Sequence, residues 1–128
     1  MDKKYPVSEI ISLYGHSGCL MVRPAKILLE SSGAAYEYID ILQDDDARAR
    51  VRAINHGYES VPTVVFPDGS TLTEPSNKLL IAKLLVLGYR PARSAIVMAY
   101  IVARAVFLVQ VAPLLVLLYL ILEVAGVL

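Results

Sequence analysis

The C-terminal stretch "AVFLVQVAPLLVLLYLIL", residues 105–122, constrains the possible folds of this chain more than any other feature. Thirteen of its residues are Val, Leu, Ile or Phe. At roughly 0.3–0.6 kcal/mol each, these side chains favour membrane insertion by about 4–8 kcal/mol, which offsets Gln110 and Pro113. The alternative is a buried core helix, but such helices are seldom apolar on every side. The stretch is long enough to cross a bilayer, and we predict a transmembrane helix over residues 105–125.

Basic residues precede this predicted span, and none follows it. They are Lys78, Lys83, Arg90, Arg93 and Arg104. The positive-inside rule then predicts a single-pass protein of the cell membrane with its N-terminal domain in the cytoplasm. Residues 89–104 are expected to form a basic juxtamembrane segment. Its apolar part, residues 95–103, leaves three alternatives open: a longer tilted helix, a segment lying along the membrane surface, or half of a hairpin.

The rest of the chain has the mixed composition of a globular domain, which we expect over residues 9–88. The formal net charge is zero, so composition gives no reason to expect a nucleic-acid partner. The single cysteine, Cys19, excludes an intrachain disulfide. Residues 1–8 have basic residues but no apolar run behind them, so we interpret them as an N-terminal extension rather than a secretory signal. A free thiol fits the reducing cytoplasm.

Local patterns predict alternating strands and helices in the globular part. Strands are expected at residues 9–15, 36–41, 61–66 and 70–73, and helices at 25–33, 44–57 and 75–87. The acidic run at residues 44–46 lacks the glycine and closing glutamate of a calcium loop, and it suits a helix start. The order β-α-β-α-β-β-α fits an α/β fold in which helices cover both faces of a four-stranded mixed sheet.

Cys19 lies where the first strand gives way to the first helix. Unpaired backbone N–H groups and the positive end of the helix dipole favour a thiolate at such a position. Pro24 disfavours helical geometry at Arg23, and a helix beginning at Pro24 would leave Cys19 in a preceding loop or 3₁₀ turn, where the dipole acts less. Two interpretations therefore remain: a reactive thiol, and a small apolar packing residue.

The stretch "VRAINHGYESVPTVVFPDGSTLTEPS", residues 51–76, together with Cys19 after the first strand, resembles the glutaredoxin family in its actinobacterial, mycoredoxin-like form. The resemblance covers residues 10–87 and implies a thioredoxin/glutaredoxin fold. It also implies a cis peptide bond before Pro62, whose loop would lie beside Cys19. By the same resemblance, Cys19 is the nucleophile that reduces mixed disulfides, and the co-substrate is a low-molecular-weight thiol such as glutathione or a mycothiol-like compound.

The resemblance further implies a binding surface made from two short segments and an arginine. Its expected residues are Ser60, Val61, Pro62, Thr73, Glu74, Ser76, Arg23 and Arg52. The segment before the proline would pair with the substrate backbone as an added strand. The segment at the start of the last helix would hold one end of the small thiol, where N–H groups favour a carboxylate. An arginine would bind a second carboxylate.

The chain also departs from the family pattern. Dithiol members carry Cys-x-x-Cys, whereas here Val22 occupies the place of the second cysteine, so any exchange must follow a monothiol route. The Cys-Gly-Phe-Ser motif of cluster-binding members is absent as well, and we expect no metal. His16, three residues before Cys19, is a candidate for stabilising the thiolate or moving a proton. Its alternative role is that of a surface-loop histidine.

Two hypotheses about function follow. The first is a membrane-anchored monothiol oxidoreductase acting through Cys19 on protein mixed disulfides. The second is a non-catalytic interaction module, or accessory subunit of a membrane complex, in which the fold binds a partner and the tail contacts lipid and other membrane proteins. Only the first requires an accessible, reactive thiol.

Overall fold

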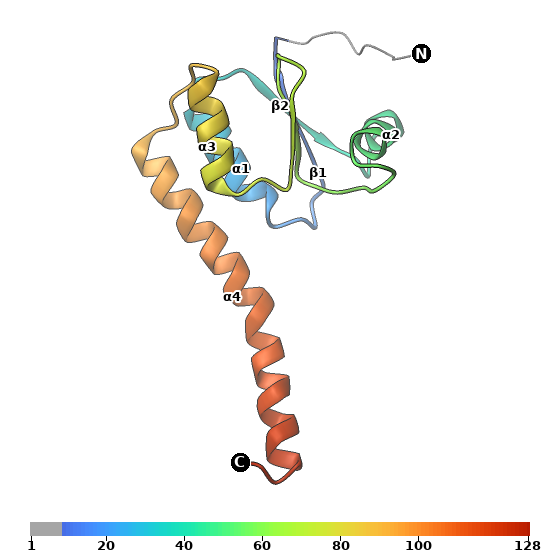
Figure 1. Ribbon diagram of the computed structural model, residues 1–128, viewed down its shortest axis with the longest axis vertical. Helices are drawn as coiled ribbons and strands as arrows, with labels where there is room; N and C mark the ends of the chain where they lie inside the picture. Colours follow the sequence, from blue (N-terminus) through green and yellow to red (C-terminus); the bar gives the residue numbers. More distant parts are fainter. Residues whose placement is uncertain (1–8) are drawn as a thin grey trace.

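The computed structural model describes residues 9–128, so the extension predicted for residues 1–8 lies outside the described part. Its elements follow the expected order and end in one long helix (Figure 1). They are β1 (Ile11–Gly15), α1 (Val22–Ser31), β2 (Tyr36–Asp40), α2 (Asp45–Ile54), β3 (Thr63–Val65), β4 (Thr71–Thr73), α3 (Asn77–Val86) and α4 (Arg93–Val124).

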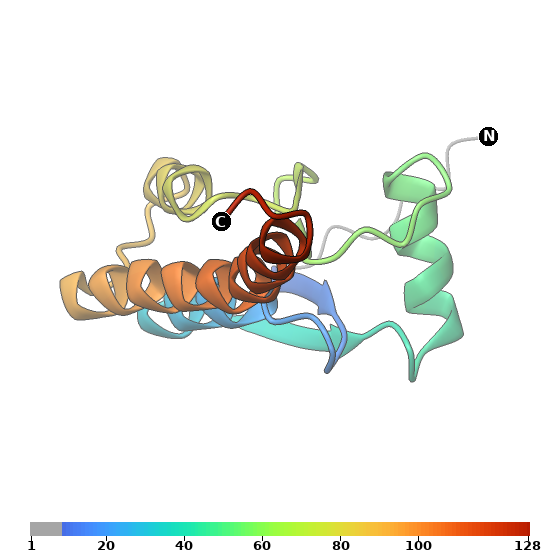
Figure 2. The ribbon, with the colours of Figure 1, turned by 90° about the horizontal axis from the view of Figure 1, so that it is seen from below.

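The four strands form one mixed sheet in the order β2-β1-β3-β4. β1 runs parallel to β2 and antiparallel to β3, and β3 pairs with β4 as an antiparallel hairpin. α2 covers one face of this sheet, while α1, α3 and the first half of α4 lie on the other (Figure 2). The α/β architecture expected from the sequence, with helices on both faces, is therefore present.

The alternation of side chains along β1 builds a core on each face of the sheet. Ile11 and Leu13 are fully buried among the side chains of α1 and α3. Tyr14 points to the opposite face and packs with Val51 of α2. Cys19 contacts both of these clusters, because the turn that carries it leaves the sheet at the end of β1.

α1 begins two residues earlier than a start at Pro24 would give. Its first residue is Val22, and Pro24 is the third residue of the helix. The first N–H groups of a helix have no intrahelical partner, so a proline here removes no hydrogen bond. At the other end, Gly33 follows the helix with φ 80°, the left-handed conformation that closes many helices.

α4 is one continuous helix of 32 residues, so the boundary expected at residue 104 lies inside it. The longer helix is thus the alternative that the structure adopts, rather than a surface segment or a hairpin. Ala99 is fully buried in the core beneath α1, and Val106 is 6% exposed. Residues 89–104, predicted as a juxtamembrane segment, contain a part of α4 that packs in the globular core.

The second half of α4 projects away from the globular unit (Figure 1). After Val106, most side chains up to Val124 are exposed. Pro113 lies within the helix without ending it. Among residues 9–128, α4 alone is long and apolar enough to cross a membrane, with a mean hydropathy of 2.7 in its most apolar window.

Candidate functional site

Cys19 is half-buried in the turn that joins β1 to α1. Its N–H donates to the carbonyl of His16 at 3.0 Å, and its own carbonyl accepts from the N–H of Val22 at 3.3 Å. The N–H of Arg23 donates to the carbonyl of Leu20 in the same way. These short-range bonds extend α1 backwards as a 3₁₀-like turn. Cys19 therefore lies just before the helix rather than in its first turn.

The thiol faces the loop that precedes β3. Its Sγ donates to the carbonyl oxygen of Val61 at 3.6 Å, and the Val61–Pro62 peptide bond is cis. The carbonyl of Pro62 in turn accepts from the N–H of Glu74 at 2.7 Å. A series of contacts therefore connects Cys19 to the two segments that the resemblance assigned to the binding surface.

Backbone conformation is unusual where the chain leaves β4. Glu74 has φ 47°, in the left-handed region that residues other than glycine seldom adopt. Such conformations persist only where the surroundings hold them, and they are frequent at binding sites. Here the bond to Pro62 holds the Glu74 backbone, and Ser76, two residues on, caps α3 by accepting from the N–H of Leu79 at 3.2 Å.

Asn55, which the sequence did not single out, fixes the position of these segments. It lies at the end of α2, and its Nδ2 donates to the carbonyl of Val51 and to Oγ1 of Thr63, each at 3.0 Å. Its Oδ1 accepts from the hydroxyl of Thr73. The Thr63 hydroxyl also donates to the carbonyl of Ser60 at 2.7 Å. The side chain of Thr73 is thus engaged within the fold and acts as support.

Beside this network lies a pocket of about 590 Å³. Its lining from the globular unit includes Met21, Pro62, Glu74, Ser76 and Lys78. Three of these five residues are predicted site residues, and Met21 follows Cys19 by two positions. The volume falls within the range of small-molecule sites in proteins. Cys19 itself is not among the lining residues; the pocket runs from Met21 and Pro62 along the first turn of α3.

Several predicted site residues lie elsewhere. Arg52 forms an ion pair with Glu59 and is not part of the pocket lining, so its role in binding a ligand carboxylate stays a prediction. Arg23 is exposed and is not part of the pocket lining. His16 turns its Nδ1 toward the N–H of Gly18, at 3.1 Å, and its carbonyl rather than its ring meets the backbone of Cys19.

Tyr38 of β2 is a neighbour of Cys19 to which no sequence pattern pointed. Burial, followed by the negative charges of Asp40 and of Cys19 as a thiolate, raises the pKa of Tyr38. The Nζ atom of Lys26 lies 3.5 Å from the centre of the Tyr38 ring. The hydroxyl of Tyr38 therefore keeps its proton and belongs to the electrostatic surroundings of the thiol.

The other side of the pocket is formed by α4, whose residues up to 104 the sequence assigned to a juxtamembrane segment and whose later residues it assigned to the membrane. Its contributors are Tyr100, Ala103, Arg104, Phe107 and Gln110. Hydropathy alone does not reveal this role, because Ala103 and Phe107 suit a lipid surface as well as a pocket. No group of three or more His, Cys, Asp or Glu residues within 9–128 is arranged to hold a metal ion.

Comparisons with known proteins identify a matching family model and related proteins. The family model described as Glutaredoxin matches residues 11–70. The chain is 37% identical over 79 residues to "Putative glutaredoxin MT3292" of Mycobacterium tuberculosis, covering 62% of this chain and 94% of that protein. It is 34% identical over 77 residues to Mycoredoxin 1 of Corynebacterium glutamicum, covering 60% and 95% respectively. Since these alignments take up nearly all of each relative, neither relative has room for a counterpart of α4.

A solved structure shows the same fold. The thioredoxin-like protein BC3987 superposes with a TM-score of 0.51 at 31% sequence identity, covering 58% of this chain and 97% of that one. The predicted thioredoxin-like fold with a four-stranded mixed sheet is confirmed. The resemblance stated from residues 51–76 is confirmed by the family model and by both relatives.

Proposed function

The chain belongs to the glutaredoxin family of thiol oxidoreductases, in its actinobacterial, mycoredoxin-like form, and from that premise we propose that it is a membrane-anchored monothiol enzyme. Its substrates are mixed disulfides between proteins and a low-molecular-weight thiol, such as glutathione or a mycothiol-like compound. One observation carries the proposal. The Sγ of Cys19 lies 3.6 Å from the carbonyl oxygen of Val61, and the next residue, Pro62, lines a pocket together with Glu74 and Ser76.

The proposed reaction has two exchange steps. In the first, the Cys19 thiolate attacks the small-thiol sulfur of the mixed disulfide, a Cys19–S–S–R bond forms, and the protein thiol leaves and takes up a proton. In the second, a further molecule of the small thiol, as thiolate, attacks the R-side sulfur. This releases the symmetrical disulfide and regenerates the Cys19 thiolate. Overall, the mixed disulfide and one free small thiol give the protein thiol and the symmetrical disulfide, so the number of disulfide bonds is unchanged and the free small thiol is the reductant. Val22, in place of a second cysteine, leaves no internal route.

Three parts of the site support this chemistry. The turn that carries Cys19 holds the sulfur half-buried just before α1, 3.6 Å from the carbonyl oxygen of Val61. The segment Ser60–Pro62 offers backbone groups to an extended substrate, as an added strand would require. Glu74 and Ser76 lie at the start of α3, where a small thiol would be held.

We also propose that α4 anchors the protein as a single-pass membrane helix, with the globular unit in the cytoplasm. The exposed, apolar second half of α4 and the basic residues that precede it support this orientation. Protease treatment of sealed inverted vesicles tests it. The globular unit should be digested while the end of α4 stays protected, and protection of the globular unit would contradict the proposed orientation.

Activity of the full-length protein in nanodiscs tests the catalytic part. Wild type should reduce a glutathionylated peptide in the presence of glutathione, and Cys19→Ser should show only the uncatalysed rate. An Arg93→Ala variant, changed on α4 outside the pocket, serves as the matched control and should keep wild-type activity. Turnover by the Cys19→Ser variant would refute the monothiol mechanism.

A second function has one specific observation in its favour. Leu20 and Met21, directly after Cys19, are 40% and 41% exposed and present apolar surface beside the thiol. Such a surface fits a docking module that holds a partner without exchanging disulfides. The pH dependence of Cys19 alkylation in the folded protein separates the two. A thiol that reacts below neutral pH supports the enzyme, and one that reacts only on unfolding supports the module.

A further inference from the structure

We propose that Arg104 of α4 makes the pocket prefer a small thiol that carries a carboxylate, such as glutathione, by binding that carboxylate. This inference rests on the proposed function, because it takes the pocket beside Cys19 as the co-substrate site. It goes beyond that function in assigning a recognition role to a helix that the two named relatives have no room to contain.

The charged groups of the pocket are arranged for an anionic ligand. Lys78 comes from the first turn of α3, Arg104 from α4, and Glu74 from the loop after β4. The structure shows no ion pair for any of these three side chains among residues 9–128. Two cations and one carboxylate therefore face a shared space without neutralising one another. Because the cations outnumber the carboxylate, the lining matches a ligand that carries more carboxylates than ammonium groups. Hydrogen bonds between such opposite charges are stronger than those between neutral groups.

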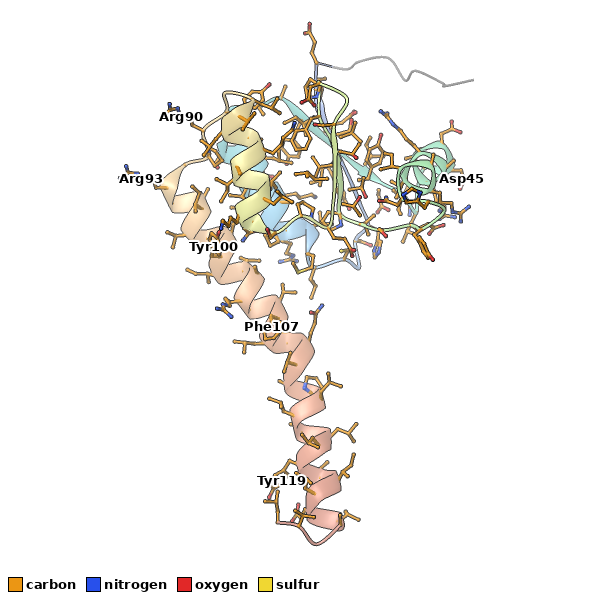
Figure 3. The ribbon with its side chains drawn as sticks, in the orientation of Figure 1. Asp45, Arg90, Arg93, Tyr100, Phe107 and Tyr119 are labelled. Carbon is orange, nitrogen blue, oxygen red and sulfur yellow. The ribbon has the colours of Figure 1, made fainter. Side chains whose placement is uncertain are left out.

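The apolar part of the lining makes these charges more effective. Tyr100 and Phe107 come from α4 and Met21 from the turn after Cys19, so hydrocarbon surrounds the space between the charges. Figure 3 shows Tyr100 and Phe107 on the stretch of α4 that passes beneath the globular unit. The three charged residues are exposed in the free protein, so the apolar lining strengthens their interactions only when a ligand fills the pocket and excludes water.

The spacing of residues on α4 explains how one helix serves both the core and the pocket. Tyr100, Ala103, Arg104 and Phe107 follow the i, i+3, i+4, i+7 pattern of a single helix face, and all four line the pocket. Ala99, one residue before Tyr100, lies on the adjacent face and is buried in the core. The small side chain of Ala103 leaves the space that the ligand would fill. The packing of α4 on α1 thereby fixes Arg104 relative to the thiol.

Binding measurements on the full chain in nanodiscs test this role without depending on turnover. The protein carries Cys19→Ser in every case, and the probes are S-methylglutathione and its dimethyl ester, which lacks free carboxylates. We expect the unesterified probe to bind about tenfold more tightly than the ester, and Arg104→Ala to remove most of that preference. Arg104→Lys should keep part of it. Arg93→Ala is the matched control, since Arg93 points away from the globular unit (Figure 3), and it should keep the full preference.

The outcomes separate this inference from the proposed function. Equal preference in Arg104→Ala and Arg93→Ala, or no preference in the Cys19→Ser background, would overturn the role of Arg104 even if the enzyme turns over normally. A preference that depends on Arg104 would support it even if the Cys19 enzyme proved inactive. A lipid headgroup is the other source of an anion. The measurement is therefore repeated with zwitterionic and with anionic lipids, and a carboxylate preference that vanishes in anionic nanodiscs would assign Arg104 to lipid.

Discussion

Enlarging Ala99 tests whether the first half of α4 belongs to the globular core. Ala99 is fully buried in the cluster that joins α1, α3 and the sheet. Replacing it with leucine adds three carbon atoms where the helices are in contact, and overpacking of this kind typically costs about 1–3 kcal/mol. In a domain of this size, that corresponds to a fall in Tm of roughly 4–20 °C.

Near-UV circular dichroism of the tyrosines is a suitable assay, because the chain has eight tyrosines and no tryptophan. Thermal unfolding of full-length protein in detergent would compare Ala99→Leu with two matched variants. Val97→Leu lies on the exposed side of the same helix and should change stability by less than about 0.5 kcal/mol. Ala103→Leu fills the pocket instead of the core, so it should leave Tm nearly unchanged and weaken binding of S-methylglutathione. An Ala99→Leu variant as stable as Val97→Leu would refute the assignment of this segment to the core.

Two further predictions concern the frame around the site. At Gly15 an added Cβ would lie 2.6 Å from Cγ2 of Val22, so Gly15→Ala should destabilise the fold by about 1–3 kcal/mol in urea titrations. Gly18→Ala is the control, because its added Cβ would meet only the ring of His16, at 3.3 Å. Equal stability of the two variants would contradict the close packing at Gly15. Hydrogen bonds from Lys83 and then from Ser70 hold the pKa of the Asp68 carboxyl well below its usual range. Because the folded pKa is the lower one, this stabilisation exists above about pH 3.8 and is lost as the pH falls further. Asp68→Asn should therefore lower the free energy of unfolding by less than about 1 kcal/mol at pH 7. It should also weaken the fall of this free energy with decreasing pH below about pH 3.8. An unchanged dependence there would refute the interaction of Asp68 with Lys83.

Much of the globular fold could be predicted because its local signals agree with one another. The alternation in β1, the glycine after α1 and the turn before β4 each predict an element that the structure contains. The helix start was less predictable. Pro24 disfavours a helix before it in general, but at the third helical position it costs no hydrogen bond, so α1 begins at Val22.

The division of α4 could not be predicted, for a physical reason. Ala99 and Val97 are both apolar, and hydropathy does not tell a side chain that packs on α1 from one that faces solvent or lipid. Arg104 shows the same limitation, since its position before the apolar stretch suggested a residue at the membrane interface rather than one in a pocket. No sequence pattern pointed to Asn55, because its side chain acts through hydrogen bonds to three residues that come together only in the folded chain.

The continuity of α4 sets how far the thiol can be from a bilayer. The part of the helix that follows Val106 has 18 residues, or about 27 Å at 1.5 Å per residue. The hydrocarbon core of a bilayer is about 30 Å thick. If α4 spans the bilayer as proposed, the globular unit rests on the headgroups, because the helix has no spare length between them. Cys19 would then stay at a nearly constant distance from the bilayer surface. It could react only with those disulfides that their proteins hold at that distance.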